Sequence, residues 1–368
     1  MRIVCNTEKL TEVCLNVQRC IPNKSVMPHL EGILIKTEGD NSIELSGFDL
    51  DLGITTKMEV KVEKSGAVVL NAKTFCEILR HLPDDTLYID CDEKNICSIK
   101  SGDAEYTVIS FDPDEYPELP KITENIPFTV SKKVIKNMIK QTIFAVSVDD
   151  SKTVHRGIKF EISAGQIRLI ALDGYRLAIR TEFTGYNGQD ISFIVPAKTL
   201  SEIIKFIDDE DELISVNIGR RHIIFNISGY CIISRLLEGD FLDYKSAVPT
   251  AKSTVVRVNT AKMIECIERA SIIITEKMKS PIKFIFDEDT IKISAVTALG
   301  SANDKITASI DGKRTEIGFN NRFILEALRS CESDEILINL NGPVAPAVIL
   351  PTEGESFLYL ILPVRIKN

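Results

Sequence analysis

A twelve-residue pattern with the periodicity of an amphipathic helix occurs three times in this chain. The copies read NAKTFCEILRHL at 71–82, PAKTLSEIIKFI at 196–207 and NNRFILEALRSC at 320–331. Their first basic residues, Lys73, Lys198 and Arg322, stand 125 and 124 positions apart. This interval is far longer than the roughly 20 to 50 residues of solenoid repeats, so it predicts domains that each build their own core.

Each copy also carries a second cation seven positions after the first, with a carboxylate between the two. Seven residues is close to two helical turns, so both cations share one face while apolar residues turn toward a core. Recurring apolar residues are explained by the core alone, but recurring exposed cations need another cause. The second cations are Arg80, Lys205 and Arg329, and the carboxylates are Glu77, Glu202 and Glu326.

A second helical pattern precedes each copy and opens with a residue type that caps helix N termini, namely Asn6, Ser131 or Asn259. β-Branched stretches interrupted by Gly, Asn or Asp predict hairpins. These stretches lie at 32–48, 157–172 and 282–296. The sequence therefore predicts an α+β fold in which each homologous domain combines two helices with antiparallel sheets.

The domain boundaries fall at a proline-rich stretch near 121–127 and just after Pro249. The predicted domains are 1–122, 123–251 and 252–368. With 368 residues, of which 44% are hydrophobic, the chain is long enough for three cores.

Composition also bears on location. No apolar run approaches the ~18 residues of a membrane-spanning helix, and the N terminus lacks the apolar core of a secretory signal, so we expect a cytoplasmic protein with no membrane contact. Nine cysteines without a CxxC pair predict a reducing compartment and free thiols.

Nothing in the sequence has the spacing of a catalytic or metal site. The four histidines are not arranged like metal ligands, and nucleotide-binding and hydrolase motifs are absent. We therefore predict no enzyme activity and no cofactor. Two alternatives stay open: an enzyme with an unfamiliar site, marked by a pocket of ionisable residues, and a monomeric or trimeric binding scaffold, marked by its mass in solution.

The net charge of −9 at first argues against nucleic acid. Sequence-independent contact with a phosphate backbone nevertheless needs only a local spread of Lys and Arg, which the six recurring cations provide if they share one surface. The alternative is that these cations form the polar face of surface helices and pair with neighbouring Glu residues.

Six segments resemble the β subunit of bacterial DNA polymerase III, the sliding clamp, in order and spacing over the whole chain. They are FDLDLGI (48–54), LDGYRLA (172–178), VPAK (195–198), EGDFLDYKSAVP (238–249), IGFNNRFILEAL (317–328) and LPVR (362–365). The resemblance implies a head-to-tail homodimeric ring that encircles duplex DNA and acts as a processivity factor. Its implied partners are the clamp loader, the replicative polymerase, and other replication and repair proteins that bind through linear motifs.

The resemblance also assigns residues to DNA. Lys24, Lys73, Arg80, Lys198 and Lys205 match basic positions of the family's channel, and the repeat adds Arg322 and Arg329. Asp149 stands where some relatives place a neutral polar DNA contact, so that contact is not expected here.

By the same resemblance, a groove for partner peptides lies between domains 2 and 3. Its residues are His155, Gly174, Tyr175, Arg176, Leu177, Leu242, Met278, Asn320, Phe323, Val344, Pro346, Leu360, Leu362, Pro363, Val364 and Arg365. Leu242 replaces a frequent proline, and His155 and Leu172 replace other side chains at the groove edge, so peptide preference is expected to differ. The implied dimer interface pairs Tyr106 and Val108 with Ile272 and Ile273 of the other copy.

Overall fold

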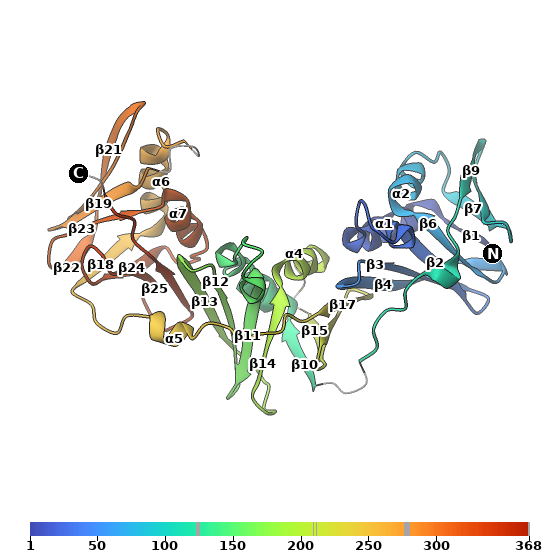
Figure 1. Cartoon of the computed structure of the whole chain (residues 1–368), viewed down its shortest axis with the longest axis horizontal. Helices are drawn as coiled ribbons and strands as arrows, with labels where there is room; N and C mark the ends of the chain where they lie inside the picture. Colours follow the sequence, from blue (N-terminus) through green and yellow to red (C-terminus); the bar gives the residue numbers. More distant parts are fainter. Residues whose placement is uncertain (123–125, 209, 211, 276–279, 367–368) are drawn as a thin grey trace. The chain divides into compact units, whose positions relative to one another are not determined.

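The computed structural model describes residues 1–122, 126–208, 210, 212–275 and 280–366. They form two compact units (Figure 1). Unit 1 comprises Met1–Lys132 and Lys198–Leu236, and unit 2 comprises Lys133–Ala197 and Leu237–Asn368. Within the described ranges, no helix is both long and apolar enough to cross a membrane.

Each of the six predicted helices is present, and short additional helices connect other elements. Asn6, Asn71, Asn259 and Asn320 cap the helices that follow them, because each side-chain oxygen accepts a backbone N–H at 2.9–3.1 Å. The N-cap predictions at Asn6 and Asn259 are thus confirmed. The α-helices are α1 Thr7–Val17, α2 Ala72–Arg80, α3 Lys132–Lys140, α4 Ala197–Phe206, α5 Tyr244–Ala247, α6 Thr260–Ser271 and α7 Asn321–Arg329. The 3-10 helices are η1 Gln18–Cys20, η2 Pro28–Glu31, η3 Pro113–Glu115, η4 Ile143–Ala145 and η5 Thr153–Arg156.

Unit 1 contains two antiparallel sheets. The first has the order β5-β1-β7-β8-β9 and the second β10-β15-β16-β17-β4-β3-β2-β6. The predicted hairpin at 32–48 is the β2–β3 pair. The strands are β1 Arg2–Asn6, β2 Gly32–Glu38, β3 Ser42–Phe48, β4 Leu52–Glu59, β5 Lys61–Lys64, β6 Ala67–Asn71, β7 Thr86–Cys91, β8 Ile96–Ser101, β9 Ala104–Ile109, β10 Ile126–Ser131, β15 Leu213–Ile218, β16 His222–Ile227 and β17 Tyr230–Arg235.

Unit 2 also contains two antiparallel sheets. Their orders are β14-β11-β12-β13-β26-β25-β24-β18-β22 and β21-β20-β19-β23. The predicted hairpins at 157–172 and 282–296 are the β11–β12 and β19–β20 pairs. The strands are β11 Gly157–Ser163, β12 Gln166–Leu172, β13 Arg176–Phe183, β14 Ile191–Pro196, β18 Thr254–Asn259, β19 Ile282–Asp287, β20 Thr290–Thr297, β21 Gly300–Thr307, β22 Ser309–Gly312, β23 Thr315–Phe319, β24 Glu335–Leu340, β25 Ala347–Pro351 and β26 Phe357–Ile361.

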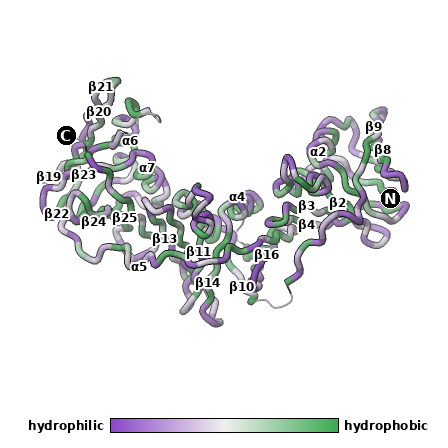
Figure 2. Tube along the Cα trace, in the orientation of Figure 1, coloured by the Kyte–Doolittle hydropathy of each residue, from purple (hydrophilic) through white to green (hydrophobic). Residues whose placement is uncertain are grey.

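Helices cover the sheets in both units and present a polar face outward. In unit 1, α1 packs against α2 and on β3 and β4 (Figure 1). In unit 2, α6 packs against α7 and on β20 and β21. Figure 2 shows hydrophobic and hydrophilic residues alternating along α2 and α7, as expected for helices with one buried face. Phe75 and Leu79 of α2 and Ile324 and Leu328 of α7 lie on the buried faces.

The predicted middle domain contributes strands to both units. Strands β10 and β15–β17 extend the sheet of unit 1, where β17 pairs with β4. Strands β11–β14 extend the sheet of unit 2, where β13 pairs with β26. Each unit is therefore stabilised by strand pairing between segments that are far apart in the sequence. The domain boundaries given above stay a prediction.

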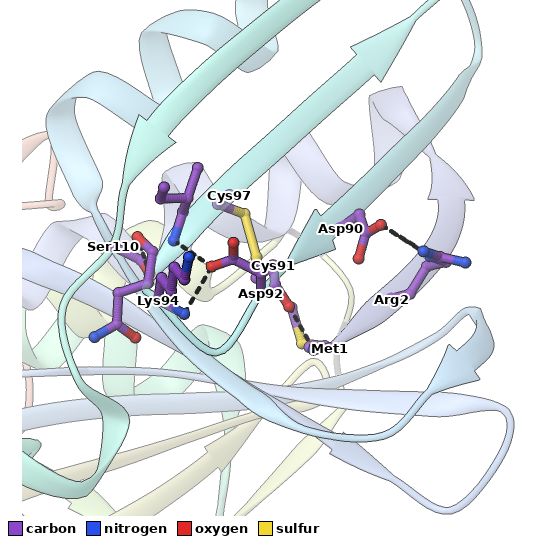
Figure 3. Close-up of a disulfide and its surroundings, with 10 residues drawn as sticks. Met1, Arg2, Asp90, Cys91, Asp92, Lys94, Cys97 and Ser110 are labelled. Carbon is purple, nitrogen blue, oxygen red and sulfur yellow. Dashed lines mark hydrogen bonds and ion pairs between the residues drawn. A yellow bond between two sulfur atoms is a disulfide. The ribbon is translucent and has the colours of Figure 1, made fainter.

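One prediction about the cysteines is wrong. Cys91 and Cys97 form a disulfide between β7 and β8, so not all nine cysteines are free thiols (Figure 3). The two residues are direct partners in the β7–β8 register, which brings their Cα atoms to 4.0 Å. Close by, the N-terminal amine of Met1 donates a 2.8 Å hydrogen bond to the carbonyl of Cys91. Elsewhere the buried thiols are core residues, and burial raises the pKa of Cys5 to about 12.

Candidate functional site

In unit 1, the predicted cations project from α2, from α4 and from the loop after η1. Lys73 and Arg80 on α2, and Lys198 and Lys205 on α4, are all exposed, as is Lys24. The opposite helix faces are buried, with Leu79 2% and Ile203 0% exposed. On α2 and α4, the apolar positions of the repeated pattern are therefore buried and the basic positions are exposed, as predicted.

Several of these cations already have ion-pair partners. Lys198 pairs with Asp49, which follows β3, and Lys205 pairs with Glu202 at 2.7 Å. Arg80 pairs with Glu77 at 3.4 Å. The pairing with neighbouring Glu that the alternative interpretation requires therefore exists. Arg80 and Glu77 are both exposed, and such a pair is worth only ~0–1 kcal/mol, so a phosphate can replace Glu77 at small cost. The Asp49 and Glu202 side chains are largely buried, at 10% and 16% exposed, so Lys198 and Lys205 are held more firmly.

Lys73 and Arg80 also line a cavity of about 590 Å³ beside η1 and α2. Its other polar lining residues are Gln18, Arg19, Asn23, Glu31 and Asn71. Within the part of the chain that the structure describes, Lys24 and Lys73 make no ion pair. The cavity thus combines cations and amide groups, which suit a phosphate oxygen, with one carboxylate, Glu31, which does not.

In unit 2, Arg322 and Arg329 project from the exposed side of α7. Arg322 donates to Glu326 at 2.8 Å, and Arg329 donates to Glu268 of α6 at 2.6 Å. Asp149 lies on a separate exposed loop, where its carboxylate accepts hydrogen bonds from Ser151 that lower its pKa. A phosphate would be repelled by this anion, in keeping with the expectation that no DNA contact forms there.

The apolar part of the predicted peptide groove lies on β13 and β26. Leu177 and Leu360 are register partners across these strands, and both are only 4% exposed. They belong to an apolar cluster with Leu172 and Tyr244, against which Phe241 packs. Leu362, directly after β26, is 37% exposed and donates its backbone N–H to the Tyr175 carbonyl at 2.8 Å.

A second part of the predicted groove is a cavity of about 770 Å³ formed by two loops and β23. Val344, Pro363, Val364 and Arg365 line it, and Val344 is 83% exposed. The backbone N–H of Val364 donates to the carbonyl of Gly318 at 2.8 Å, which fixes the C-terminal segment beside β23.

Arg176 is held inside unit 2 instead of pointing into solvent. Its Nε donates to Asp173 Oδ2 at 3.0 Å and its Nη1 donates to Glu326 Oε2. Its guanidinium carbon lies 4.4 Å from the centre of the Phe323 ring and 5.4 Å from that of Phe144. The side chain is only 6% exposed, so it forms part of a wall.

The other predicted groove residues are dispersed around these two parts. Tyr175 stacks on Phe323 with ring centres 6.2 Å apart, and Gly174 has the positive φ of +93° that its turn requires. His155 meets Phe241 edge to face at 5.3 Å, while Leu242 is exposed. Asn320 caps α7, Pro346 lines a separate small cavity, and Met278 lies outside the described residues.

Two of the predicted interface residues lie on an edge strand and the other two directly follow a helix. Tyr106 and Val108 are on β9, the last strand of its sheet in unit 1. Ile272 directly follows α6 and is 79% exposed, whereas Ile273 is half-buried. Because α6 packs on β21, which is itself an edge strand, both predicted surfaces offer unpaired strand edges.

Sequence reasoning missed several residues that shape these surfaces. Phe241 and Val248 pack against the Leu177 cluster, and both stand in the segment EGDFLDYKSAVP, so the signal was present. Asp173 and Glu326 hold Arg176, a role that no local pattern indicates because Glu326 is 150 residues away. No group of three or more metal-ligating side chains occurs in the described ranges.

Family models of the DNA polymerase III beta subunit match the chain in order. The N-terminal domain matches residues 1–120, the central domain 129–243 and the C-terminal domain 245–365. The beta sliding clamp of Bacillus subtilis is 30% identical over 99% of this chain and 100% of its own length. That of Halalkalibacterium halodurans is 29% identical with the same coverage.

Solved structures agree with these matches. The sliding clamp from Bacillus subtilis has a TM-score of 0.97, 30% identity and full coverage of both chains. A putative DNA polymerase III beta subunit from Eubacterium rectale has a TM-score of 0.95 and 33% identity over 99% of both chains. A sliding clamp from Bartonella birtlesii, solved bound to griselimycin, has a TM-score of 0.92 and 28% identity over 100% of both chains. The predicted α+β clamp fold is confirmed, and the chain belongs to the DNA polymerase III beta subunit family.

Proposed function

We propose that two copies of this chain close head to tail into a ring around duplex DNA, with three clamp domains per chain at 1–122, 123–251 and 252–368. The protein is a non-catalytic processivity factor of DNA replication that works with a clamp loader and a polymerase. The proposed location is the cytoplasm.

The observation that carries this proposal is the exposure of one pair of cations on each of three equivalent helices, α2, α4 and α7. Long, exposed side chains attract a phosphate backbone without reading bases, so the protein can move along the duplex. We assign this role to Lys24, Lys73, Arg80, Lys198, Lys205, Arg322 and Arg329.

Partner peptides are proposed to bind in unit 2. Leu362, Val344 and Val364 offer exposed apolar surface beside the buried Leu177 and Leu360, which suits the spaced apolar side chains of a short linear motif. Since such a peptide must be ordered on binding, we expect an affinity on the order of micromolar. Arg176 is engaged internally, so its proposed role is to shape the groove.

The dimer contact is proposed to join β9 of one copy, with Tyr106 and Val108, to the α6 end of the other, with Ile272 and Ile273. Pairing of β9 with β21, the edge strand on which α6 packs, would cover two exposed strand edges at once.

A processivity assay tests the function. The replicative polymerase and clamp loader of a related bacterium would extend a primed single-stranded circle with and without this protein. The proposal predicts much longer products in single binding events when the protein is present. Unchanged product lengths, with the loader shown to be active on its own clamp, would contradict it.

A further inference from the structure

Glu326 is shared between two arginines of unit 2 that belong to different proposed surfaces. Its Oε2 accepts from Nη1 of Arg176, at the start of β13 in the groove wall. Its Oε1 accepts from Nε of Arg322, one turn earlier on α7, at 2.8 Å. Burial pushes the pKa of Glu326 up, but the two guanidiniums more than offset this and hold it below its usual value, so the group is charged at neutral pH.

The position of Arg176 depends on this carboxylate. The guanidinium lies against Phe323 and near Phe144, and it pairs with the carboxylates of Asp173 and Glu326. Phe323 in turn stacks on Tyr175, so the anchored arginine holds an aromatic wall made of two predicted groove residues. A weaker hold by Glu326 would loosen this wall.

Arg322, unlike Arg176, is exposed to solvent where it pairs with Glu326. Its side chain is 73% exposed, against 6% for Arg176. A phosphate can therefore reach Arg322 and compete with Glu326 for it, whereas Arg176 is shielded.

We propose that Glu326 couples the two surfaces. When a DNA phosphate binds Arg322, the Glu326 carboxylate pairs with Arg176 alone. That pairing then fixes the groove wall, so partner peptides bind more tightly. Glu326 is thus a positioning residue for the groove. The inference rests on the proposed function and adds a regulation to it. Because binding free energies are linked, bound peptide must raise DNA affinity by the same factor.

The test measures this factor with the full-length protein. The probe is a fluorescein-labelled peptide in which one glutamine precedes spaced leucine and phenylalanine residues. Its affinity is measured by anisotropy with and without a saturating short duplex. We expect an increase of about two- to fivefold with DNA, the range that an exposed ion pair supplies.

Three variants separate the coupling from general damage. Glu326→Gln should abolish the DNA effect. Glu77→Gln, at the equivalent position of α2, should keep it, because the ion-pair partners of Glu77 among the described residues are Arg80 and His81, at the end of α2 and directly after it. Arg322→Ala should bind peptide as tightly without DNA as wild type does with it. Arg322 is largely exposed, so this variant also keeps the test decisive if Glu326→Gln does not fold.

The outcomes separate a failure of the coupling from a failure of the proposed clamp function. If peptide and DNA both bind but neither alters the other, the coupling is refuted and the clamp assignment stands. Persistence of the DNA effect in Glu326→Gln or Arg322→Ala would also refute it. If neither peptide nor DNA binds the wild-type protein, the proposed function itself fails.

Discussion

Leu177 and Leu360 face each other as register partners across β13 and β26, and both side chains are buried in the same apolar cluster. They form the floor of the proposed groove and also part of the core of unit 2. Changing either residue therefore disturbs folding as well as binding. Truncating a buried leucine to alanine costs about 2–5 kcal/mol of stability.

The groove is better tested at residues that are exposed. Leu362→Asp and Val344→Asp should weaken peptide binding by about tenfold or more, because each places a charge where an apolar side chain docks. Calorimetric titration would measure the affinity, and thermal unfolding should be nearly unchanged. Phe183→Asp, at the exposed far end of β13, is the matched control. Peptide affinity equal to wild type in both groove variants would remove these residues from the groove.

The cationic helices should contribute charge-dependent, sequence-independent DNA binding. Lys198→Glu with Lys205→Glu should weaken DNA association and reduce the slope of log affinity against log salt by about 2. Lys57→Glu with Lys61→Glu, at the exposed end of β4 and start of β5, changes the net charge equally and should have little effect. A salt slope identical in wild type and the α4 variant would show that these lysines do not meet phosphate.

Dimer closure should depend on Ile272. Burying this exposed side chain against a partner stabilises the contact by about 2 kcal/mol, so Ile272→Ala should weaken dimerisation roughly tenfold or more. Sedimentation over a range of concentrations would measure the change, with Val148→Ala as an exposed control. Dimerisation as tight as wild type in Ile272→Ala would place the interface elsewhere.

His155 should make stability depend on pH. Burial, aided by the charge of Lys152, lowers the pKa of His155, and in the described structure neither ring nitrogen has a hydrogen-bond partner. The unfolded chain therefore binds this proton more readily, so stability falls as pH drops below about 6.5 toward the folded pKa. Urea unfolding at successive pH values should show a smaller loss in His155→Asn. An equal loss in both proteins would assign the effect to other groups.

The Cys91–Cys97 bond predicts the thiol count of the purified protein. Without reductant, the denatured chain should expose seven reactive thiols, those outside the disulfide, and full reduction should expose all nine cysteines. The bond closes a short loop and should stabilise the fold by about 2 kcal/mol. Nine reactive thiols before reduction would show that the two cysteines are adjacent but unbonded.

Helices and hairpins were predictable because the residue patterns that indicate them lie within a single short segment. The helices α1, α2, α3, α4, α6 and α7 follow from apolar spacing, and the β2–β3, β11–β12 and β19–β20 hairpins follow from alternation and turn residues. The exposure of the repeated cations follows from the same helical period.

Contacts between distant segments were not predictable from such patterns. The pairing of β17 with β4 and of β13 with β26 depends on tertiary packing. The pair Lys198–Asp49 joins residues 149 positions apart, and the burial of Arg176 depends on Glu326. The residues of the groove came from family resemblance, and their peptide contacts stay a prediction.

Topological retention on DNA tests the central claim most directly. The protein, loaded by a clamp loader onto a nicked circular plasmid, would be separated from free protein by gel filtration in high salt, before and after the plasmid is cut once. A closed ring predicts that the protein stays with the circle in high salt and is lost on linearisation, because it slides off the ends. Release from the intact circle, or equal retention on circular and linear DNA, would contradict a sliding ring.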